Sequence, residues 1–488
     1  MITCANIIAH SGASFGTSGV RGLVEDLDDE SCFAFTVAFL SQLVEEKALK
    51  NDAKVWVGHD LRPSSPAIAV AVLSAIDHLG LTPVFCGEIA TPALAFSSIA
   101  AKEPAVMITG SHIPFDRNGI KFYRSDGEMT KADEALVLNS TKDFPEQLFN
   151  NKKLRPQAIQ IPTIRMAHDA WLHRYKSAFE GVLEGMRVGH YQHSAAGRDD
   201  LSNLLQALGA NVIPLMRSET FVPIDTEAVS ESDRDQAKSW TKEYNLDALV
   251  STDGDGDRPL LADENGNYLR GDTLGIFTAM ALKANAVVTP VSSNTALEKC
   301  KLFSTIGRTK IGSPHVIAKM EEFSSNKEHS IVGFEANGGF LTASELKSPW
   351  NNNTLGPLPT RDSVLPVLAT IALAKIKDIK ISELASLLPQ RITASDRLVE
   401  TPKEKSLALL AKFESSEANP SDLTITNVPL DITDTTDGMR FTFQDETIVH
   451  LRPSGNAPEL RIYVETEAQS SADALLTNAV QATKALLD

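Results

Sequence analysis

Short apolar segments alternate with longer helix-like patterns over most of the chain. The segments 54–60 (KVWVGHD), 82–87 (TPVFCG) and 104–110 (PAVMITG) predict strands, and residues 65–80 predict a helix that ends at Gly80. This βαβ rhythm, which continues to about residue 380, is typical of parallel sheets covered by helices. Because ligands bind at the carboxyl ends of the strands in such sheets, we expect the loops that follow the strands to carry the function.

Three strand–loop junctions share one design, in which a short apolar strand leads into a glycine-rich polar loop. The strand in PAVMITGSHIP breaks at Ser111, the strand in DALVSTDGDGD breaks at Asp253, and the strand in SIVGFEANGG breaks at Glu335. The three segments share almost no sequence identity. Their common pattern nevertheless indicates a threefold structural repeat.

Other segments interrupt or follow this pattern. Residues 261–272 predict a hairpin with its turn at Asn265 and Gly266, and residues 348–362 predict a polar loop. The composition changes in the last hundred or so residues, where 428–467 alternates in the manner of antiparallel strands. We therefore expect a separate α+β domain at the C-terminal end of the chain.

The composition is that of a large globular protein. With 488 residues, of which 42% are apolar and 22% charged, the chain is long enough for about three or four domains. Its net charge of −17 argues against nucleic acid or an anionic membrane as the main partner. We see neither a signal peptide nor an apolar run long enough to cross a bilayer. The absence of a CxxC pair argues against a disulfide framework, so we expect a reduced, cytoplasmic protein; its cysteines are Cys4, Cys32, Cys86 and Cys300.

The loop DGDGDR places three aspartates at alternate positions. In an extended segment such residues share a face, so Asp253, Asp255 and Asp257 can converge on one point. Adjacent carboxylates repel unless a cation neutralises them, and their hard oxygens suit Mg²⁺, Ca²⁺ or Mn²⁺. An EF-hand is disfavoured, because Arg258 stands where that loop needs glycine. A solvated acidic turn is the other alternative.

Four further loops carry candidate chemistry, although each one read alone is consistent with an ordinary turn. Ser111 is a candidate nucleophile, but a Ser-His-Asp hydrolase is disfavoured, because His112 is adjacent in sequence and the G-x-S-x-G elbow is absent. The glycine-rich segment 14–22 contains one cation, Arg21. FEANGG offers a carboxylate and a carboxamide for vicinal hydroxyls, and residues 451–465 offer the hydroxyl and guanidinium groups of a phosphate cradle.

Taken together, these loops resemble those of the α-D-phosphohexomutase family, the phosphoglucomutases and phosphomannomutases. TGSHIPFDRNGIKFY looks like the family's phosphoserine loop, DGDGDR matches its metal loop, FEANGG is similar to its sugar-selecting loop, and RPSGNAPELR resembles its phosphate loop. The resemblance runs nearly end to end and in the family's order. It implies three similar α/β domains (1–156, 157–262 and 263–388) and a C-terminal α+β domain (389–488), arranged around a central cleft.

The resemblance also implies a mechanism. Ser111 would carry a phosphoryl group, and one Mg²⁺ per chain would bridge it to Asp253, Asp255 and Asp257. The phosphoryl would pass to a hexose monophosphate, the hexose 1,6-bisphosphate would turn around, and its other phosphate would return to the serine. The other residues implied in catalysis or substrate binding are His112, Arg21, Lys121, Arg258, Glu335, Asn337, Gly338, His315, Arg452, Ser454, Gly455, Asn456 and Arg461.

Departures from the family's motifs affect the substrate more than the chemistry. Asn337 stands where Ser or Thr is common, Asn456 replaces the usual Thr, and His190 and His193 occupy a stretch that is usually glycine-rich. A metal pair at these histidines is less expected than structural roles. We predict a hexose 6-phosphate/1-phosphate mutase, monomeric or homodimeric, with mannose as the favoured sugar. Phosphoglucomutase and phosphoglucosamine mutase are alternatives, and a Mg²⁺-dependent sugar phosphatase or a non-enzymatic binding module would be a different class.

Overall fold

The computed structural model divides the chain into two compact units. The first unit comprises Met1–Lys283 and Asn337–Ser382, and the second comprises Ala284–Ala336 and Glu383–Asp488. The structure describes residues 2–16, 19–49, 52–155, 161–325, 330–425, 428–454 and 458–487.

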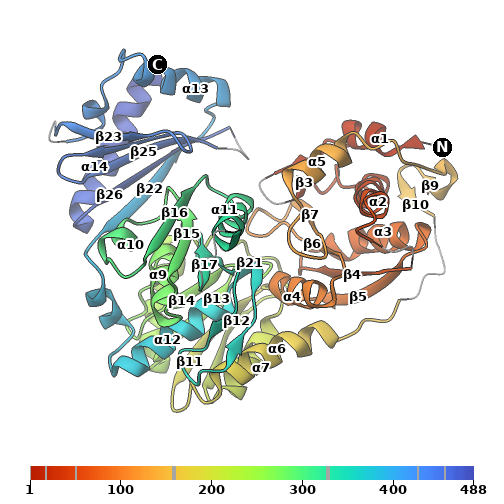
Figure 1. The fold of residues 1–488 in the computed structure, drawn as a ribbon, viewed down its shortest axis with the longest axis horizontal. Helices are drawn as coiled ribbons and strands as arrows, with labels where there is room; N and C mark the ends of the chain where they lie inside the picture. The colour runs from red at the N-terminus through yellow and green to blue at the C-terminus, as the bar shows by residue number, and fades with distance from the viewer. Residues whose placement is uncertain are drawn as a thin grey trace. The chain divides into compact units, whose positions relative to one another are not determined.

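The first unit begins with a six-stranded mixed sheet in the order β2-β3-β7-β6-β4-β5 (Figure 1). Strand β4 pairs in parallel with β5 and β6, whereas β7 pairs antiparallel with β6 and β3. The apolar segments read as strands in the sequence are therefore confirmed. The strands are β2 (Ser14–Phe15), β3 (Val20–Leu23), β4 (Lys54–His59), β5 (Thr82–Glu88), β6 (Ala105–Ile108) and β7 (Arg117–Tyr123).

A second sheet of this unit repeats the arrangement with the order β12-β11-β13-β14. Its central strand β11 is parallel to both β12 and β13, and β14 returns antiparallel to β13. The turn predicted at Asn265 and Gly266 follows β14, where the Gly266 N–H donates to the Asp263 carbonyl oxygen over 2.9 Å. The strands are β11 (Arg187–His193), β12 (Asn211–Arg217), β13 (Ala248–Thr252) and β14 (Pro259–Ala262).

The second unit contains the same parallel order a third time, as β16-β15-β17. In each repeat the first strand lies between the second and the third and is parallel to both. The first strands are β4, β11 and β15. The three loops singled out in the sequence follow β6, β13 and β17, which is the third strand of each repeat. The structure therefore supports the predicted threefold repeat; its strands here are β15 (Ala286–Pro290), β16 (Thr305–Thr309) and β17 (Ile331–Phe334).

The C-terminal part of the second unit is an antiparallel sheet in the order β22-β26-β25-β24-β23, as its alternating sequence predicts (Figure 1). Helix α14 packs on β22 and β26, and α13 packs on β25. The predicted fold class, α/β domains followed by an α+β domain, is confirmed. The elements are β22 (Ile392–Leu398), β23 (Leu430–Asp434), β24 (Met439–Phe443), β25 (Ile448–Pro453), β26 (Leu460–Thr466), α13 (Lys403–Glu414), η3 (Pro420–Leu423) and α14 (Gln469–Leu487).

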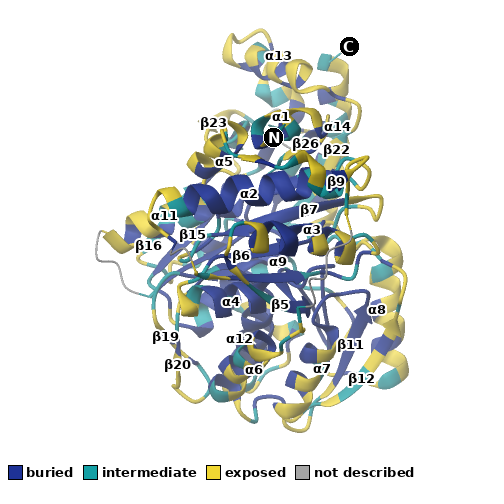
Figure 2. Ribbon diagram, turned by 90° about the vertical axis from the view of Figure 1, so that its right-hand side faces the viewer, coloured by how far each residue is buried: buried dark blue, intermediate teal, exposed yellow. Residues whose placement is uncertain are grey.

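Helices bury the core of each unit. Helix α2 is buried along most of its length and packs on α3, which in turn covers β4 (Figure 2). In the first unit the helices are α1 (Cys4–His10), α2 (Asp29–Glu45), α3 (Ser65–His78), α4 (Thr91–Ala101), α5 (Lys131–Leu138), α6 (Met166–Phe179), α7 (Arg198–Ala207), α8 (Glu231–Tyr244), α9 (Gly271–Ala281) and α12 (Val364–Lys377); in the second, α10 (Ala296–Lys299) and α11 (Ser313–Ser325) precede α13 and α14. No helix among the described residues is long and apolar enough to cross a membrane.

One predicted loop is wrong in part. Residues 348–362 contain the strands β20 and β21, and β21 pairs antiparallel with β18. The polar residues NNN led to the prediction of a loop, although the short strand LPTRD follows them. The domain boundaries drawn from the sequence stay a prediction. The remaining short elements are β1 (Ile2–Thr3), β8 (Asp143–Phe144), β9 (Phe149–Asn150), β10 (Lys153–Leu154), β18 (Phe340–Thr342), β19 (Leu346–Lys347), β20 (Thr354–Leu355), β21 (Leu358–Asp362), η1 (Glu146–Leu148) and η2 (Ser382–Leu387).

Candidate active site

The three aspartates of the DGDGDR loop form a buried cluster. One carboxylate oxygen from each of Asp253, Asp255 and Asp257 lies within 4.8 Å of the others, and all three residues are almost completely buried. The loop is a turn between β13 and β14 rather than the extended segment that the sequence argument assumed. The turn is closed by the Asp257 N–H, which donates to Asp253 Oδ1 over 3.2 Å. The flanking strands exclude the helix–loop–helix of an EF-hand.

Cations from distant segments neutralise this cluster. Lys121 Nζ on β7 donates to Asp255 Oδ2 over 2.6 Å and to Asp257 Oδ2 over 2.8 Å, and Arg361 Nε on β21 donates to Asp257 Oδ2 over 3.0 Å. Burial acts to raise the pKa of Asp257, but Arg361 and Lys121 lower it below its usual value. Burial and the neighbouring Asp255 and Asp257 raise the pKa of Asp253 well above its usual value. The cluster is therefore asymmetric, with Asp253 as the carboxylate that most readily accepts a proton.

Ser111 meets this cluster directly. Its Oγ donates to Asp253 Oδ2 over 2.9 Å, although the two residues are 142 positions apart in the chain. Ser111 has a φ of 55°, in the left-handed region that a serine seldom adopts, which costs conformational energy. Gly254 lets the two loops approach, because a Cβ there would lie 2.8 Å from the Ser111 carbonyl oxygen. The backbone is thus shaped to hold the hydroxyl against the carboxylate.

Arg62 holds the serine loop in this shape. Its buried guanidinium donates to the carbonyl oxygens of Ser111 (2.8 Å), Ile113 (2.5 Å), Pro114 (2.7 Å) and Arg117 (2.9 Å). Its Nε donates to the Asp60 carboxylate over 3.2 Å, and that carboxylate also accepts from the Gly110 N–H over 3.3 Å, so one buried ion pair fixes both ends of the loop's first turn. No lysine could make this fork of hydrogen bonds.

His112 is arranged as a neutral neighbour rather than as a general base for the serine. Burial and Arg258 lower the pKa of His112 to about 3. Its Nδ1 accepts from Arg258 Nη1 over 2.8 Å and lies 3.4 Å from Ser111 Oγ. Because Nδ1 is already engaged by a cation while the serine hydroxyl donates to Asp253, the geometry does not form a Ser-His-Asp triad.

The donor set fits a hard divalent cation. The Oδ1 atoms of Asp255 and Asp257 are buried and have no hydrogen-bond partner among the described residues. Such orphaned carboxylate oxygens, next to the Ser111–Asp253 hydrogen bond, are the kind of ligands that Mg²⁺ uses. Arg21 on β3, the third predicted catalytic cation after Lys121 and Arg258, donates through Nη1 to the Thr109 carbonyl oxygen, and burial lowers its pKa to about 10, so it stays charged near neutral pH.

In the second unit, Asp437 joins two of the predicted substrate loops. Its Oδ2 accepts from Arg452 Nε over 2.8 Å and from the Ile311 N–H over 2.9 Å. His315 lies in the first turn of α11, next to this loop. The other members that the structure describes in this unit are Glu335 and Ser454, both buried, and Arg461 on β26. The predicted residues Gly455 and Asn456 lie outside the described residues.

The remaining predictions fall in the first unit. The Asn337 carbonyl oxygen accepts from Thr226 Oγ1 over 2.8 Å, and Gly338 has a φ of 88° with its Cα close to Pro259. His190 Nδ1 lies 2.7 Å from Ser202 Oγ, and His193 Nε2 lies 2.9 Å from the Thr252 carbonyl oxygen. Both histidines are buried, which agrees with structural roles rather than with a metal pair.

Four residues that support the site escaped the sequence analysis. They are Arg62, Arg361, Asp437 and Thr91, whose Oγ1 donates to Asp255 Oδ2 over 2.8 Å. None lies in a glycine-rich loop. The signal that could have found Arg62 and Arg361 is a charged residue directly beside a short apolar strand, in GHDLR and LPTRD.

Comparisons with known proteins identify the family of the chain. The models described as "Phosphoglucomutase/phosphomannomutase" match residues 12–145 as alpha/beta/alpha domain I, residues 270–392 as alpha/beta/alpha domain III and residues 399–482 as the C-terminal domain. The phosphomannomutase of Salmonella muenchen is 46% identical to the chain, with 96% of this chain and 95% of that protein covered. The phosphomannomutase of Sinorhizobium fredii (strain NBRC 101917 / NGR234) is 40% identical, with 95% and 97% covered.

Solved structures share the fold. A phosphoglucomutase/phosphomannomutase family protein from Burkholderia thailandensis has a TM-score of 0.74 at 18% identity, covering 100% of this chain and 98% of that one. The Aspergillus fumigatus N-acetylphosphoglucosamine mutase in complex with GlcNAc-6P and magnesium has a TM-score of 0.57 at 14% identity, with both chains covered fully. With the long matches at 40% and 46% identity and the three family domains in order, the chain belongs to the phosphoglucomutase/phosphomannomutase family, and it is an enzyme of the mutase class.

Proposed function

We propose that the protein interconverts mannose 6-phosphate and mannose 1-phosphate through a phosphorylated Ser111 and a mannose 1,6-bisphosphate intermediate. The observation that carries the proposal is the 2.9 Å hydrogen bond from Ser111 Oγ to Asp253 Oδ2 inside the buried aspartate cluster. The high identity to two phosphomannomutases supports mannose as the sugar. The more distant matches include phosphoglucosamine mutases at 25–28% identity, which supports glucosamine less.

The forward transfer moves a phosphoryl group from Ser111 to the free hydroxyl of the sugar monophosphate. The P–Oγ bond breaks, a bond from phosphorus to the sugar oxygen forms, and the sugar hydroxyl loses its proton. The proton that the sugar hydroxyl gives up balances the one that Ser111 Oγ takes up, so the transfer involves no net gain or loss of protons. The return transfer reverses these bonds at the other end of the bisphosphate, so the enzyme ends phosphorylated.

The charge that develops in these transfers is met by fixed cations. Lys121 and Arg361 are already held by the aspartates, Arg258 is held against His112, and Arg21 is half-buried beside β6. Cations fixed before the reaction stabilise a phosphoryl transition state without reorganisation. Mg²⁺, held by Asp253, Asp255, Asp257 and the phosphoryl group of Ser111, would act as a Lewis acid on the phosphoryl oxygens.

The sugar phosphate would be held by the residues of the predicted substrate loops. Arg452, with its guanidinium oriented by Asp437, and Ser454 would bind the phosphate that is not reacting. Glu335 and Asn337 would bind two adjacent sugar hydroxyls. A magnesium-bound relative of the same fold, the Aspergillus fumigatus enzyme in complex with GlcNAc-6P, supports both the metal and the class of ligand.

A panel of hexose 1-phosphates tests the function and its sugar. We expect kcat/KM for mannose 1-phosphate to exceed that for glucosamine 1-phosphate by about tenfold or more, with glucose 1-phosphate between them. Formation of the isomeric 6-phosphate is followed together with release of inorganic phosphate. A phosphatase would release phosphate at the rate of substrate loss and would not need a hexose 1,6-bisphosphate activator. That outcome would replace the mutase proposal.

Ser111→Ala removes the nucleophile and is expected to lower kcat by at least about 10³-fold, because the hydroxyl that would carry the phosphoryl group is lost. Incubation with mannose 1,6-bisphosphate should add one phosphoryl group to the wild type and none to the variant, as measured by intact-protein mass spectrometry. Ser325→Ala, at an exposed serine in α11, is the matched control and should keep both properties. A fully active Ser111→Ala enzyme would refute the covalent route.

Asp257→Asn should weaken Mg²⁺ binding by about tenfold or more, because it removes one negative ligand from the cluster. Titration calorimetry of the chelator-treated protein measures the affinity, and activity should return in the wild type when Mg²⁺ is added back. Asp126→Asn, at a side chain that is 84% exposed, is the control for the change of charge. Equal Mg²⁺ affinity in both variants would show that the metal does not bind at the aspartate cluster.

Arg62→Lys keeps a positive charge but loses the fork that holds the serine loop. We expect kcat to fall by about 10²-fold with little change in KM, because the hydroxyl is misplaced while the substrate loops are untouched. Arg198→Lys is the matched control, since Arg198 is also buried and also donates to backbone carbonyl oxygens, those of His193 and Ser218. If both variants lose the same stability and the same kcat, Arg62 has only a general structural role.

A further inference from the structure

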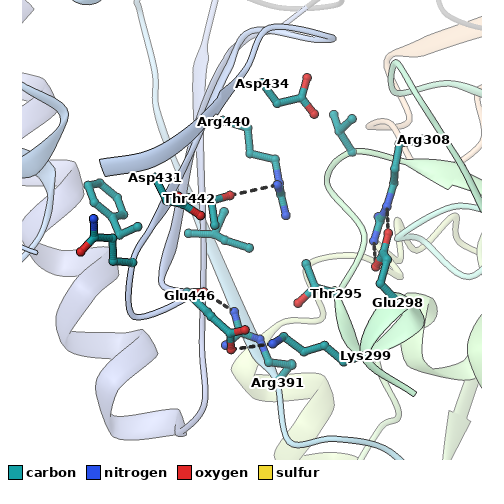
Figure 3. A pocket seen from close by; sticks show the side chains of 14 residues that line it. Thr295, Glu298, Lys299, Arg308, Arg391, Asp431, Asp434, Arg440, Thr442 and Glu446 are labelled. Carbon is teal, nitrogen blue, oxygen red and sulfur yellow. Dashed lines mark hydrogen bonds and ion pairs between the residues drawn. The ribbon is translucent and has the colours of Figure 1, made fainter. Parts of the chain in front are cut away.

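A cavity of about 460 Å³ lies within the second unit, apart from the residues assigned to the reaction (Figure 3). Its walls come from the segment that carries α10 and β16 and from the sheet β22–β26. This volume is in the range of pockets that bind small molecules. Charged side chains make up more than half of the lining: Glu298, Lys299, Arg308, Arg391, Asp431, Asp434, Arg440 and Glu446.

Two of the cations are fully engaged by protein partners. Arg308 Nε and Nη2 donate to the two carboxylate oxygens of Glu298 over 2.8 and 2.7 Å, and its Nη1 donates to the carbonyl oxygens of Pro290 and Ser293. Lys299 Nζ pairs with Glu446 over 2.5 Å. These pairs close two walls of the cavity and leave little attraction for a further ion.

Arg391 is different, because its guanidinium is incompletely bonded. Its Nε donates to Glu465 over 2.6 Å and its Nη2 to the Glu446 carbonyl oxygen over 2.6 Å. Its Nη1 is buried and has no hydrogen-bond partner among the described residues, although the residue is only 7% exposed. Because Nη1 is itself buried, it does not open onto the cavity, and Arg391 contributes positive charge to the wall rather than a free donor for a ligand.

Arg440 is the second incompletely bonded cation of the cavity. Figure 3 shows its side chain reaching from β24 into the space between the two walls. Its guanidinium donates one long hydrogen bond of 3.3 Å to Thr442 Oγ1, and no carboxylate lies within ion-pair distance of it in the described part of the chain. Burial and the nearby Arg308 lower the pKa of Arg440, although Glu465, Asp434 and Glu298 act in the opposite direction.

We propose that this cavity is a second ligand site, which binds a small hydroxylated anion through Arg440, with the charge of Arg391 adding to the attraction. A phosphate or carboxylate group offers the two adjacent oxygens that guanidinium forks recognise. Asp431 and Asp434, on the β23 side of the same cavity, accept hydrogen bonds and favour hydroxyl groups on the remainder of the ligand. A purely anionic ligand such as inorganic phosphate would gain nothing from those carboxylates.

The site would couple two parts of the second unit. Arg391 lies at the start of β22, Arg440 lies on β24, and α10 with Thr295 forms the facing wall. A ligand that binds Arg440 and also contacts Thr295 would stabilise the arrangement in which the two walls face each other. This inference does not depend on which sugar the active site accepts.

Calorimetric titration of the full chain tests the second site, with mannose 6-phosphate as the phosphate probe and gluconate as the carboxylate probe. We expect two sites for mannose 6-phosphate in the wild type. Arg440→Gln should weaken one of them by about tenfold or more, because it removes a charge-assisted hydrogen bond. Arg452→Gln should weaken the other, so the two sites are distinguished within one experiment.

Two further variants keep the test decisive. Arg440→Lys retains the charge without the fork and should weaken the second site by several-fold, which separates recognition from loss of folding. Arg234→Gln, at an exposed arginine of α8, is the control for the change of charge and should leave both sites intact. Gluconate binding that Arg440→Gln abolishes supports the site and assigns the carboxylate class. A single mannose 6-phosphate site that Arg440→Gln leaves unchanged would overturn the proposal.

Discussion

The site depends on one electrostatic constraint, the burial of three carboxylates in contact with one another. Two like charges about 4 Å apart repel by roughly 4 kcal/mol at an effective dielectric constant of about 20, and burial adds a desolvation cost for each. Lys121 and Arg361 offset part of this cost. The hydrogen bond that Ser111 Oγ donates to Asp253 stabilises part of the charge on that carboxylate. The remaining imbalance is what would let the cluster bind a divalent cation and act beside a serine that, under the proposed function, changes its own charge when phosphorylated.

The repeated sheet explains how such a cluster can be assembled from distant parts of the chain. In each repeat, the loop of interest follows the third strand, so it lies where a central strand ends. Two of these loops carry Ser111 and Asp253, which meet across the two sheets of the first unit. An acidic protein can thus handle an acidic substrate, because the cations that matter are concentrated at loop ends and do not have to outweigh the net charge of −17.

The sequence predicted the elements and the reacting groups better than it predicted their supports. Strand–loop junctions and the DGDGDR motif are local patterns, so β6, β13 and the three aspartates could be recognised within a few residues. Arg62, Thr91 and Arg361 act through contacts with loops 49, 164 and 104 residues away, and nothing local marks such a contact. Even the correct convergence of the aspartates was argued from an extended segment, whereas the observed turn depends on the Asp257 N–H reaching Asp253.

The same physical criterion identifies both ligand sites of this molecule. At the aspartate cluster the under-bonded groups are acceptors, the Oδ1 atoms of Asp255 and Asp257, and at the second-unit cavity the under-bonded group is a donor, the guanidinium of Arg440. A charged group that lacks one of its hydrogen bonds is not fully compensated by the folded chain. Each site therefore keeps an uncompensated charge, which is negative at the first and positive at the second. A cation satisfies the first and an anion the second. The complementarity of the two charges makes it physically consistent for one chain to bind a divalent metal in one unit and an oxyanion in a cavity of the other.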